Sequence, residues 1–158
     1  MIGTLSQAKT LGIGVPGLLA LLRIGLGLWW LESWRHKNKR AWFEDGAGIA
    51  WAKSVADKHR WPAVRTGFQK VVEPRPKLMA YVVVYSELAI GLGVTLGFLT
   101  PIALGGAIVL NAMYFVLMVH DWAEQGQNSM MALIALVCIL GEANQAFSID
   151  HLLHILGG

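Results

Sequence analysis

The sequence predicts an all-α integral membrane protein, a bundle of four transmembrane helices with a long amphipathic loop between helices one and two. Three observations predict this fold class. Hydrophobic residues make up 55% of the 158 residues and charged residues only 15%, against roughly 25% charged in soluble domains. The mean hydropathy is positive, at +0.51. Fifteen of the 23 charged side chains fall between Arg35 and Lys77, which leaves long stretches of chain almost free of charge.

Cysteine content and charge exclude several classes of function. The single cysteine, Cys138, excludes a disulfide framework, a Cys-x-x-Cys redox pair and a metal site rich in thiolates. The net charge of +3 does not indicate a nucleic-acid partner, because the basic residues are concentrated in one loop beside the membrane. The lipid bilayer is therefore the first partner that we expect.

Four apolar segments are long enough, or nearly so, to cross a bilayer core of roughly 30 Å, which takes about 20 helical residues. The expected spans are about 12–34, 78–98, 101–119 and 129–147, with an interfacial loop at 35–77. Pro101 stands at a favourable helix start. The fourth span is the weakest, because its apolar stretch at 129–141 has to extend through Glu142 and Asn144 towards Phe147.

Connection lengths and basic residues predict the topology. The connection at 97–101 is so short that the second and third spans are expected to form a tight antiparallel hairpin. Four spans place both termini on one membrane face. Eleven Lys and Arg residues lie in 35–77 and none in 120–127, while Lys9 is the one basic residue expected on the opposite face. The positive-inside rule then predicts an inner-membrane protein with cytoplasmic loops and both termini outside.

The long loop at 35–77 is expected to contain short helices. Trp42, Trp51 and Trp61 alternate with Lys and Arg residues, and apolar residues recur at roughly helical spacing. Such a stretch favours the headgroup region, where aromatic rings and cations contact lipid. Prolines break it into pieces; they are Pro62, Pro74 and Pro76. A surface that binds a partner protein is the alternative interpretation.

Two charged residues stand inside predicted spans, where a charge costs at least about 2.5–3.5 kcal/mol on insertion scales. Arg23 is central in the first span and Glu87 is central in the second. Gly27 and Gly91 each follow one of these charges by four residues, so each glycine shares a helix face with a charge. Glycines let membrane helices approach closely. We therefore expect a buried Arg23–Glu87 ion pair, in which loss of either partner is severe.

Asn111 is expected at a similar depth in the third span, and three interpretations remain open. A structural clamp would use the polar residues to hold the helices in register. A quinone site would use Arg23 or Asn111 as a donor to a ring carbonyl, with Glu87 handling a proton. A transport pathway is the third interpretation, and it rests on a single polar layer.

A second polar cluster is expected near the inner membrane face. Glu32 and His36 are four residues apart, and His120 and Asp121 end the third span. These side chains are of the types that bind a divalent metal or relay protons. A haem between the two histidines is geometrically conceivable, but no histidine lies deep in a span. No metal or haem site is therefore predicted.

Two helix caps are expected near the end of the chain. Asn128 precedes the fourth apolar stretch, and its side chain is expected to accept hydrogen bonds from the following amides. Ser148 is expected to cap a final short helix over 149–156, with Asp150 favourable in its first turn.

Short motifs, spread over nearly the whole chain, occur in an order and spacing that resemble a known family. They are Arg23-Ile-Gly-Leu-Gly27, Trp34–Lys37, Phe68–Val72, Glu87-Leu-Ala-Ile-Gly91-Leu-Gly93, Leu96–Thr100, Asn128 and Ser148-Ile-Asp150. In these motifs the sequence resembles the DoxX family of small four-span membrane proteins, and within it the DoxD-like branch.

The resemblance implies a function. DoxD-like proteins are associated with thiosulfate:quinone oxidoreductase, in which they form the membrane subunit beside a separate partner. The expectation is a membrane subunit of a quinone-linked oxidoreductase that oxidises a small reduced sulfur compound, with quinone contacts at Arg23 and Asn111 and proton handling at Glu87. The alternative is a non-catalytic accessory or scaffold subunit of a larger membrane complex, since fold alone does not determine function. Cys138 is expected inside the fourth span, so any sulfur chemistry would need a partner subunit.

Overall fold

The structure, a computed structural model, describes residues 14–153, and its regular structure over that range is entirely helical. The four long helices are α2 (Val15–His36), α6 (Pro76–Leu96), α7 (Thr100–Leu117) and α8 (Trp122–Leu140). The short helices are α3 (Lys39–Phe43), α4 (Ala47–Asp57), α5 (Pro62–Gly67), the π-helical η1 (Phe68–Val72) and α9 (Ile149–Leu152). The expected all-α class is therefore confirmed for the described residues. The expected start of the first span at Gly12 lies outside them, as does Lys9.

Three of the described helices, α2, α6 and α7, are long and apolar enough to cross a membrane. Their outward faces carry large apolar side chains. On α7, Ile102, Val109 and Met113 are each at least 60% exposed. Such extensive apolar exposure is typical of a surface that contacts lipid. The chain is thus a membrane protein by the length, composition and surface of its helices.

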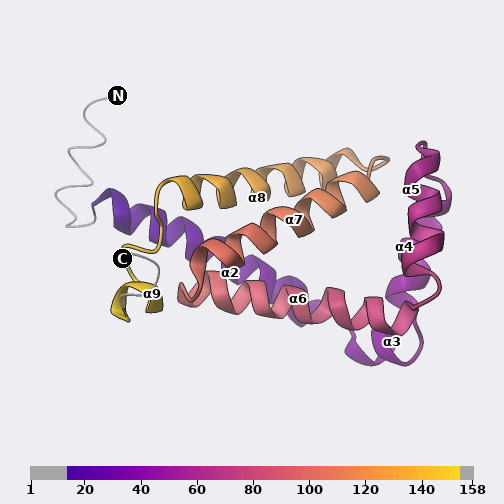
Figure 1. Ribbon diagram of the computed structural model, residues 1–158, viewed down its shortest axis with the longest axis horizontal. Helices are drawn as coiled ribbons and strands as arrows, with labels where there is room; N and C mark the ends of the chain where they lie inside the picture. The colour runs from indigo at the N-terminus through magenta and orange to yellow at the C-terminus, as the bar shows by residue number, and fades with distance from the viewer. Residues whose placement is uncertain (1–13, 154–158) are drawn as a thin grey trace.

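The long helices pack side by side in a closed order, α2 against α6, α6 against α7, α7 against α8 and α8 against α2 (Figure 1). Their shared core is apolar. Its most buried members are Trp30, Val94, Leu104, Ala107, Ala135, Cys138 and Ala143. The predicted inaccessibility of Cys138 is confirmed, because this side chain is buried on α8.

Glycines bring α2 and α6 into close contact, as the sequence predicted. A Cβ atom added at Gly27 would lie 2.5 Å from the backbone nitrogen of Thr95, and one added at Gly91 would lie 2.9 Å from that of Leu31. Both distances are far below van der Waals contact. The two backbones therefore touch at the glycines, and these contacts fix the register of the two antiparallel helices.

This register contradicts the expected Arg23–Glu87 ion pair. Since Gly27 lies opposite Thr95 and Gly91 lies opposite Leu31, Arg23 is level with the end of α6. Glu87 is level with the C-terminal end of α2. The two charges are then separated by about 12 residues along the helix axes, roughly 18 Å at the rise of an α-helix. Each has other partners, which are described below.

The expected hairpin between α6 and α7 is present, and a distant residue closes it. Gly97 adopts a left-handed backbone with φ of 65°, which only glycine does without strain, and Leu99 follows with φ of 48°. The buried Asp150 carboxylate accepts hydrogen bonds from the backbone nitrogens of Leu99 and Thr100, at 2.8 and 2.7 Å. Asp150 thus satisfies the first amides of α7, whereas the sequence analysis placed its effect in α9.

The fourth long helix differs from its predicted bounds. It begins at Trp122, where the side chain of Asp121 accepts from the backbone nitrogens of Ala123 and Glu124. It ends at Leu140, and the chain turns without regular helix until Ser148. The expected extension of this helix to Phe147 is therefore wrong.

The two predicted caps had different outcomes. The expected cap at Asn128 is wrong, because this residue lies inside α8 and donates to the carbonyl of Glu124 at 2.7 Å. The expected cap at Ser148 is confirmed, because its side chain accepts from the nitrogen of His151. The remainder of the expected final helix, residues 154–156, lies outside the described residues.

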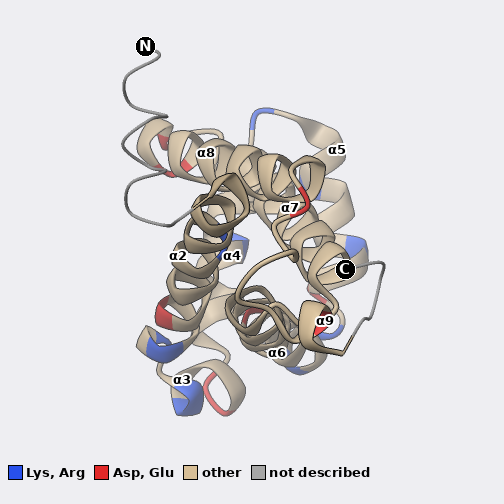
Figure 2. Ribbon diagram, turned by 90° about the vertical axis from the view of Figure 1, so that its left-hand side faces the viewer, with Lys and Arg blue, Asp and Glu red and all other residues tan. Residues whose placement is uncertain are grey.

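The stretch expected as a long loop is mostly helical and lies across one end of the long helices, opposite to α9 (Figure 1). Pro62 begins α5 and Pro76 begins α6, so the expected division into short pieces is confirmed. Figure 2 shows cationic and acidic residues on and around α3, whereas most of the ribbon of the long helices carries no charge. Lys53 on α4 hydrogen-bonds Glu73, and this bond raises the pKa of Lys53.

His59 fixes these short helices to α7, a role that the sequence analysis did not foresee. Its side chain is fully buried. The backbone nitrogen of Trp61 donates to Nδ1 at 3.0 Å, so Nε2 carries the proton and donates to the carbonyl of Val116 at 2.8 Å. Both ring nitrogens are therefore satisfied across the junction between the short helices and α7.

Candidate functional site

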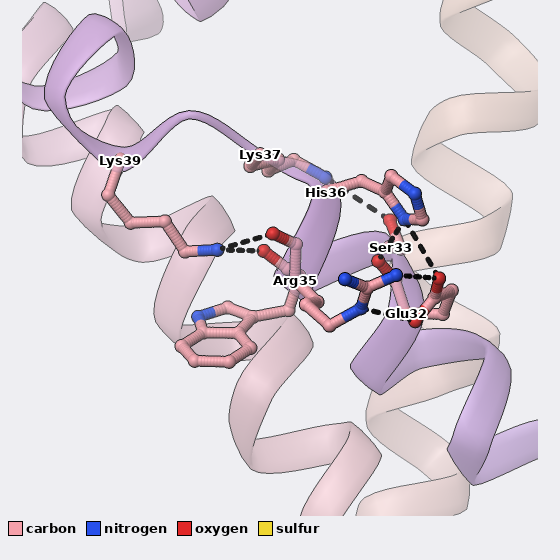
Figure 3. A network of polar contacts seen from close by, with 7 residues as sticks. Glu32, Ser33, Arg35, His36, Lys37 and Lys39 are labelled. Carbon is pink, nitrogen blue, oxygen red and sulfur yellow. Dashed lines mark hydrogen bonds and ion pairs between the residues drawn. The ribbon is translucent and has the colours of Figure 1, made fainter.

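The buried carboxylate of Glu87 is the centre of a polar network where α2, α6 and α7 meet. Lys37, directly after α2, donates to both carboxylate oxygens at 2.8 and 2.6 Å. The phenol of Tyr114 donates to Oε1 at 2.8 Å. Lys37 also contacts Ser33 Oγ at 3.2 Å, as Figure 3 shows. Because Lys37 neutralises Glu87, the charge inside the helices is compensated.

The side chain of Asn111, one turn before Tyr114 on α7, has no hydrogen-bond partner among the described residues. It is completely buried, and neither Nδ2 nor Oδ1 bonds to another group in that part of the chain. The indole nitrogen of the buried Trp30 is unpaired as well. Buried polar atoms are nearly always hydrogen-bonded in native proteins. Asn111 and Trp30 therefore keep free hydrogen-bonding capacity within the described residues, as Arg23 Nε, Thr95 Oγ1 and Thr100 Oγ1 do elsewhere.

A cavity of about 440 Å³ lies at these residues, within the range typical of small-molecule sites. Asn111, Trp30, Glu87 and Tyr114 form part of its wall. Much of the remaining wall is aromatic or sulfur-containing, from Trp29, Trp42, Trp51, Met118 and Met131. The rings of Trp30 and Tyr114 stack with their centroids 6.4 Å apart. The wall also contains other polar and charged residues, among them Ser33, Lys37, Gln127 and Asn128. The cavity thus combines aromatic surfaces with many polar groups.

Arg23 does not belong to this cavity, although the sequence analysis placed it beside Asn111. Its guanidinium lies at the opposite end of the helices and donates to the carbonyls of Val94 at 2.7 Å and Phe147 at 2.6 Å. A weaker contact reaches the carbonyl of Thr95 at 3.4 Å. Arg23 therefore ties the segment after α8 to the end of α6, and its role in the structure is to hold that segment in place.

Around the mouth of the cavity, the expected Glu32–His36 contact is present. Glu32 pairs with His36 at 3.1 Å and with Arg35 at 2.6 Å, as Figure 3 shows. His120 instead contacts the carbonyl of Lys58. In the described part of the chain, no three His, Cys, Asp or Glu side chains are grouped so that they can hold a metal ion.

Lys39 lies two residues after Lys37 but has different hydrogen-bond partners. Its ammonium group hydrogen-bonds the backbone carbonyls of Trp34 and Arg35, as Figure 3 shows, and lies 4.0 Å from the centre of the Trp34 ring. Burial lowers the pKa of Lys39. The two lysines therefore differ sharply, since only Lys37 hydrogen-bonds the buried carboxylate.

The sequence analysis found Glu87 and Asn111 but missed the other polar members of this site. Tyr114 is three residues from Asn111, a spacing that places both on one helix face, so this signal was available. Lys37 stands directly after an apolar span, where a basic residue is ordinary. The indole nitrogen of Trp30 carries no sequence signal that separates it from the other tryptophans.

We compared the chain with models of protein families, with curated proteins and with solved structures, and none of them matches it. The site is therefore interpreted from its own geometry. The site has three distinctive features: the unpaired side-chain amide of Asn111, the buried carboxylate of Glu87 that Lys37 neutralises, and a wall rich in aromatic side chains.

Proposed function

We propose that the protein is a membrane subunit of a quinone-linked oxidoreductase and that its cavity holds the quinone head group. The unpaired amide of Asn111 is the observation that carries this proposal. A ring carbonyl can accept from Asn111 Nδ2, and a ring hydroxyl can donate to Oδ1. Such an amide therefore matches both redox states of a quinone, which takes up two electrons and two protons on reduction.

The charge of the cavity supports a neutral ligand. Its buried acid, Glu87, is already paired with Lys37, so an added anion or cation would be left without compensation in a medium of low dielectric. The flat walls supplied by Trp30 and Tyr114 favour an aromatic ring. A quinone is neutral, flat and soluble in lipid. The contacts expected from the sequence are thus proposed here for Asn111 and Glu87 and no longer for Arg23.

We also propose that all four long helices cross the inner membrane, with α3 to η1 on the cytoplasmic side. The α8 helix has 19 residues, and it packs against α7 and α2. The Lys and Arg residues of 35–77 support this orientation. It places the cavity, whose wall includes Glu124 and Gln127, near the cytoplasmic surface.

A partner subunit supplies the electrons in this proposal. Cys138 is buried, and its sulfur faces the carbonyl of Leu19 at 3.9 Å, so the described residues offer no accessible thiol for sulfur chemistry. Oxidation of a small reduced sulfur compound, which the DoxD-like resemblance implies, would take place on the partner.

Asn111→Leu tests the proposal. The purified protein in lipid nanodiscs is titrated with a short-chain ubiquinone, and quenching of the cavity tryptophans reports binding. We expect about 5- to 150-fold weaker binding in Asn111→Leu, because one lost hydrogen bond is worth about 1–3 kcal/mol when its partner stays buried. The control is Met113→Leu, two residues away on the exposed face of the same helix, and it should bind as the unchanged protein does.

Two results would contradict the quinone site. One is equal binding by Asn111→Leu and the unchanged protein. The other is the absence of saturable quenching while companion proteins are co-purified, which would favour the scaffold alternative. In the scaffold alternative, a partner protein could not dock at Gly27 and Gly91, because the contact between α2 and α6 already occupies both glycines.

A further inference from the structure

The polar network around Glu87 is continuous from the molecular surface to the cavity. The side chain of Lys37 is 16% exposed, whereas that of Glu87 is fully buried. Lys37 donates to both oxygens of Glu87, at 2.8 and 2.6 Å, and Tyr114 donates to Oε1 of the same carboxylate at 2.8 Å. All three residues are part of the cavity wall. Three titratable groups thus form one hydrogen-bonded row along this wall, from the partly exposed Lys37 to the Tyr114 hydroxyl.

We propose that Lys37, Glu87 and Tyr114 form a proton path that connects the polar end of the molecule with the ligand in the cavity. The inference rests on the proposed quinone site and deepens it, because it assigns how that site exchanges protons. Lys37 is then more than a counter-ion for Glu87: it is the positioning residue through which protons enter and leave.

The transfer of one proton balances along this row. The Tyr114 hydroxyl gives its proton to a ring oxygen that has gained negative charge from the partner's reduced redox centre. Glu87, protonated by the Lys37 ammonium, returns a proton to the Tyr114 oxygen and becomes a carboxylate again. Lys37, left as a neutral amine, takes a proton from water. One proton moves from water to the ring oxygen, and all three side chains regain their starting states.

Other charged groups near Glu87 do not replace this row. Glu32, His36 and Glu124 also line the cavity, but Glu32 is paired with Arg35 and His36, and no hydrogen bond joins any of the three to Glu87 in the described structure. Lys39 contributes charge nearby while its ammonium hydrogen-bonds two backbone carbonyls. Lys37 and Tyr114 are thus the side chains that hydrogen-bond the Glu87 carboxylate within the described residues.

Lys37→Arg separates a proton path from a simple ion pair. Arginine keeps the positive charge and hydrogen-bonds carboxylates well, but it does not lose its proton. The variant should therefore fold and bind a short-chain ubiquinone as the unchanged protein does. Lys39→Arg is the matched control, because it makes the same chemical change two residues away, at a lysine without a hydrogen bond to Glu87.

Two measurements are made on the loaded protein in nanodiscs. The first is the time-resolved infrared difference spectrum during reduction by a reduced viologen, in which the transient carboxyl band of protonated Glu87 is identified by its loss in Glu87→Gln. The second is the rate of reduction as a function of pH. In Lys37→Arg we expect the Glu87 band to be missing and the rate to fall by at least about 100-fold, the lower end for a lost proton-transfer group. Lys39→Arg should keep both.

The outcomes distinguish the two proposals. If Lys37→Arg binds the quinone and keeps the band, the rate and its pH profile, the proton path is overturned while the quinone site stands. If the unchanged protein binds no quinone, the proposed function itself has failed. If Lys37→Arg still binds the quinone but loses both the band and the rate, and Lys39→Arg keeps both, the path is supported.

Discussion

The pairing of Glu87 with Lys37 shows how one residue outside a span can make a charge inside it tolerable. Glu87 is fully buried, and both of its oxygens are occupied by Lys37. Removing one partner from such a pair leaves an uncompensated buried charge, whereas removing both leaves none. The consequence is a strong non-additivity between the two positions.

Lys37→Met should destabilise the protein by about 3–5 kcal/mol, the usual loss when one member of a buried pair is removed. The double variant Lys37→Met with Glu87→Gln should recover most of that loss, because no unpaired charge remains. Thermal unfolding in detergent, followed by tryptophan fluorescence, measures both. Arg35→Met is the control at an exposed pair, for which we expect little change. Equal melting of the single and double variants would contradict the buried pair.

At the scale of single residues, the sequence identified which polar groups are buried better than it identified their partners. Arg23, Glu87 and Asn111 are all fully buried. Arg23 was nevertheless assigned to the wrong partner, because its true acceptors are backbone carbonyls, including that of Phe147. A carbonyl far along the chain has no signature in the sequence, whereas a carboxylate on the neighbouring span is an obvious candidate.

The interface of α2 with α6 depends on glycines that tolerate no side chain. At Gly27 a Cβ atom would overlap the backbone of Thr95, while at Gly25, two residues earlier on the same helix, it would meet nothing within 4 Å. The contrast follows from the helical period, which turns one glycine towards α6 and the other away from it. The interface therefore offers a matched pair of positions.

Gly27→Leu should disrupt the packing of α2 against α6, and Gly25→Leu should leave it intact. We expect the Gly27 variant to lose most of its folded yield, since a leucine there has to displace backbone. The measurement is the fraction of monodisperse protein after extraction in a mild detergent, with the melting temperature of what remains. Similar behaviour of both variants would contradict the observed register.

At the scale of helices, the sequence predicted the three more apolar segments well and the fourth poorly. Hydropathy alone placed the fourth helix at 129–147, but the structure begins it at Trp122 because Asp121 supplies a cap. Polar residues in its first turns hid this start from a search for apolar runs. The helix ends at Leu140 because the chain turns there towards Ser148. Tertiary contacts determine this turn.

For the molecule as a whole, the charged residues gather at one end. The segment 35–77 carries 15 of the 23 charged residues, while the long helices present apolar faces. This distribution supports the proposed orientation in the membrane, because translocating many basic residues is unfavourable. The α4 helix, which carries the exposed Ser54, and the segment after α8, which contains the exposed Gln145, lie towards opposite ends of the molecule (Figure 1).

Cysteine labelling in a Cys138→Ala background tests the proposed topology. We expect Gln145→Cys to react with an impermeant maleimide in intact cells, and Ser54→Cys to react only after lysis. Three crossings separate the two positions when α8 spans the membrane, and two when it does not. Labelling of both from one side would therefore exclude the fourth span, and the reverse pattern would invert the orientation.

The hydrogen bonds from Leu99 and Thr100 to Asp150 have a consequence for the way the protein is made. During synthesis the connection between α6 and α7 leaves the ribosome about 50 residues before the carboxylate that completes it, since domains form as the chain is elongated. Until then the first amides of α7 have to find water or lipid headgroups. The last step of assembly is thus the docking of the segment around Asp150 onto helices that are already inserted. It takes place at the end of the molecule away from the cavity.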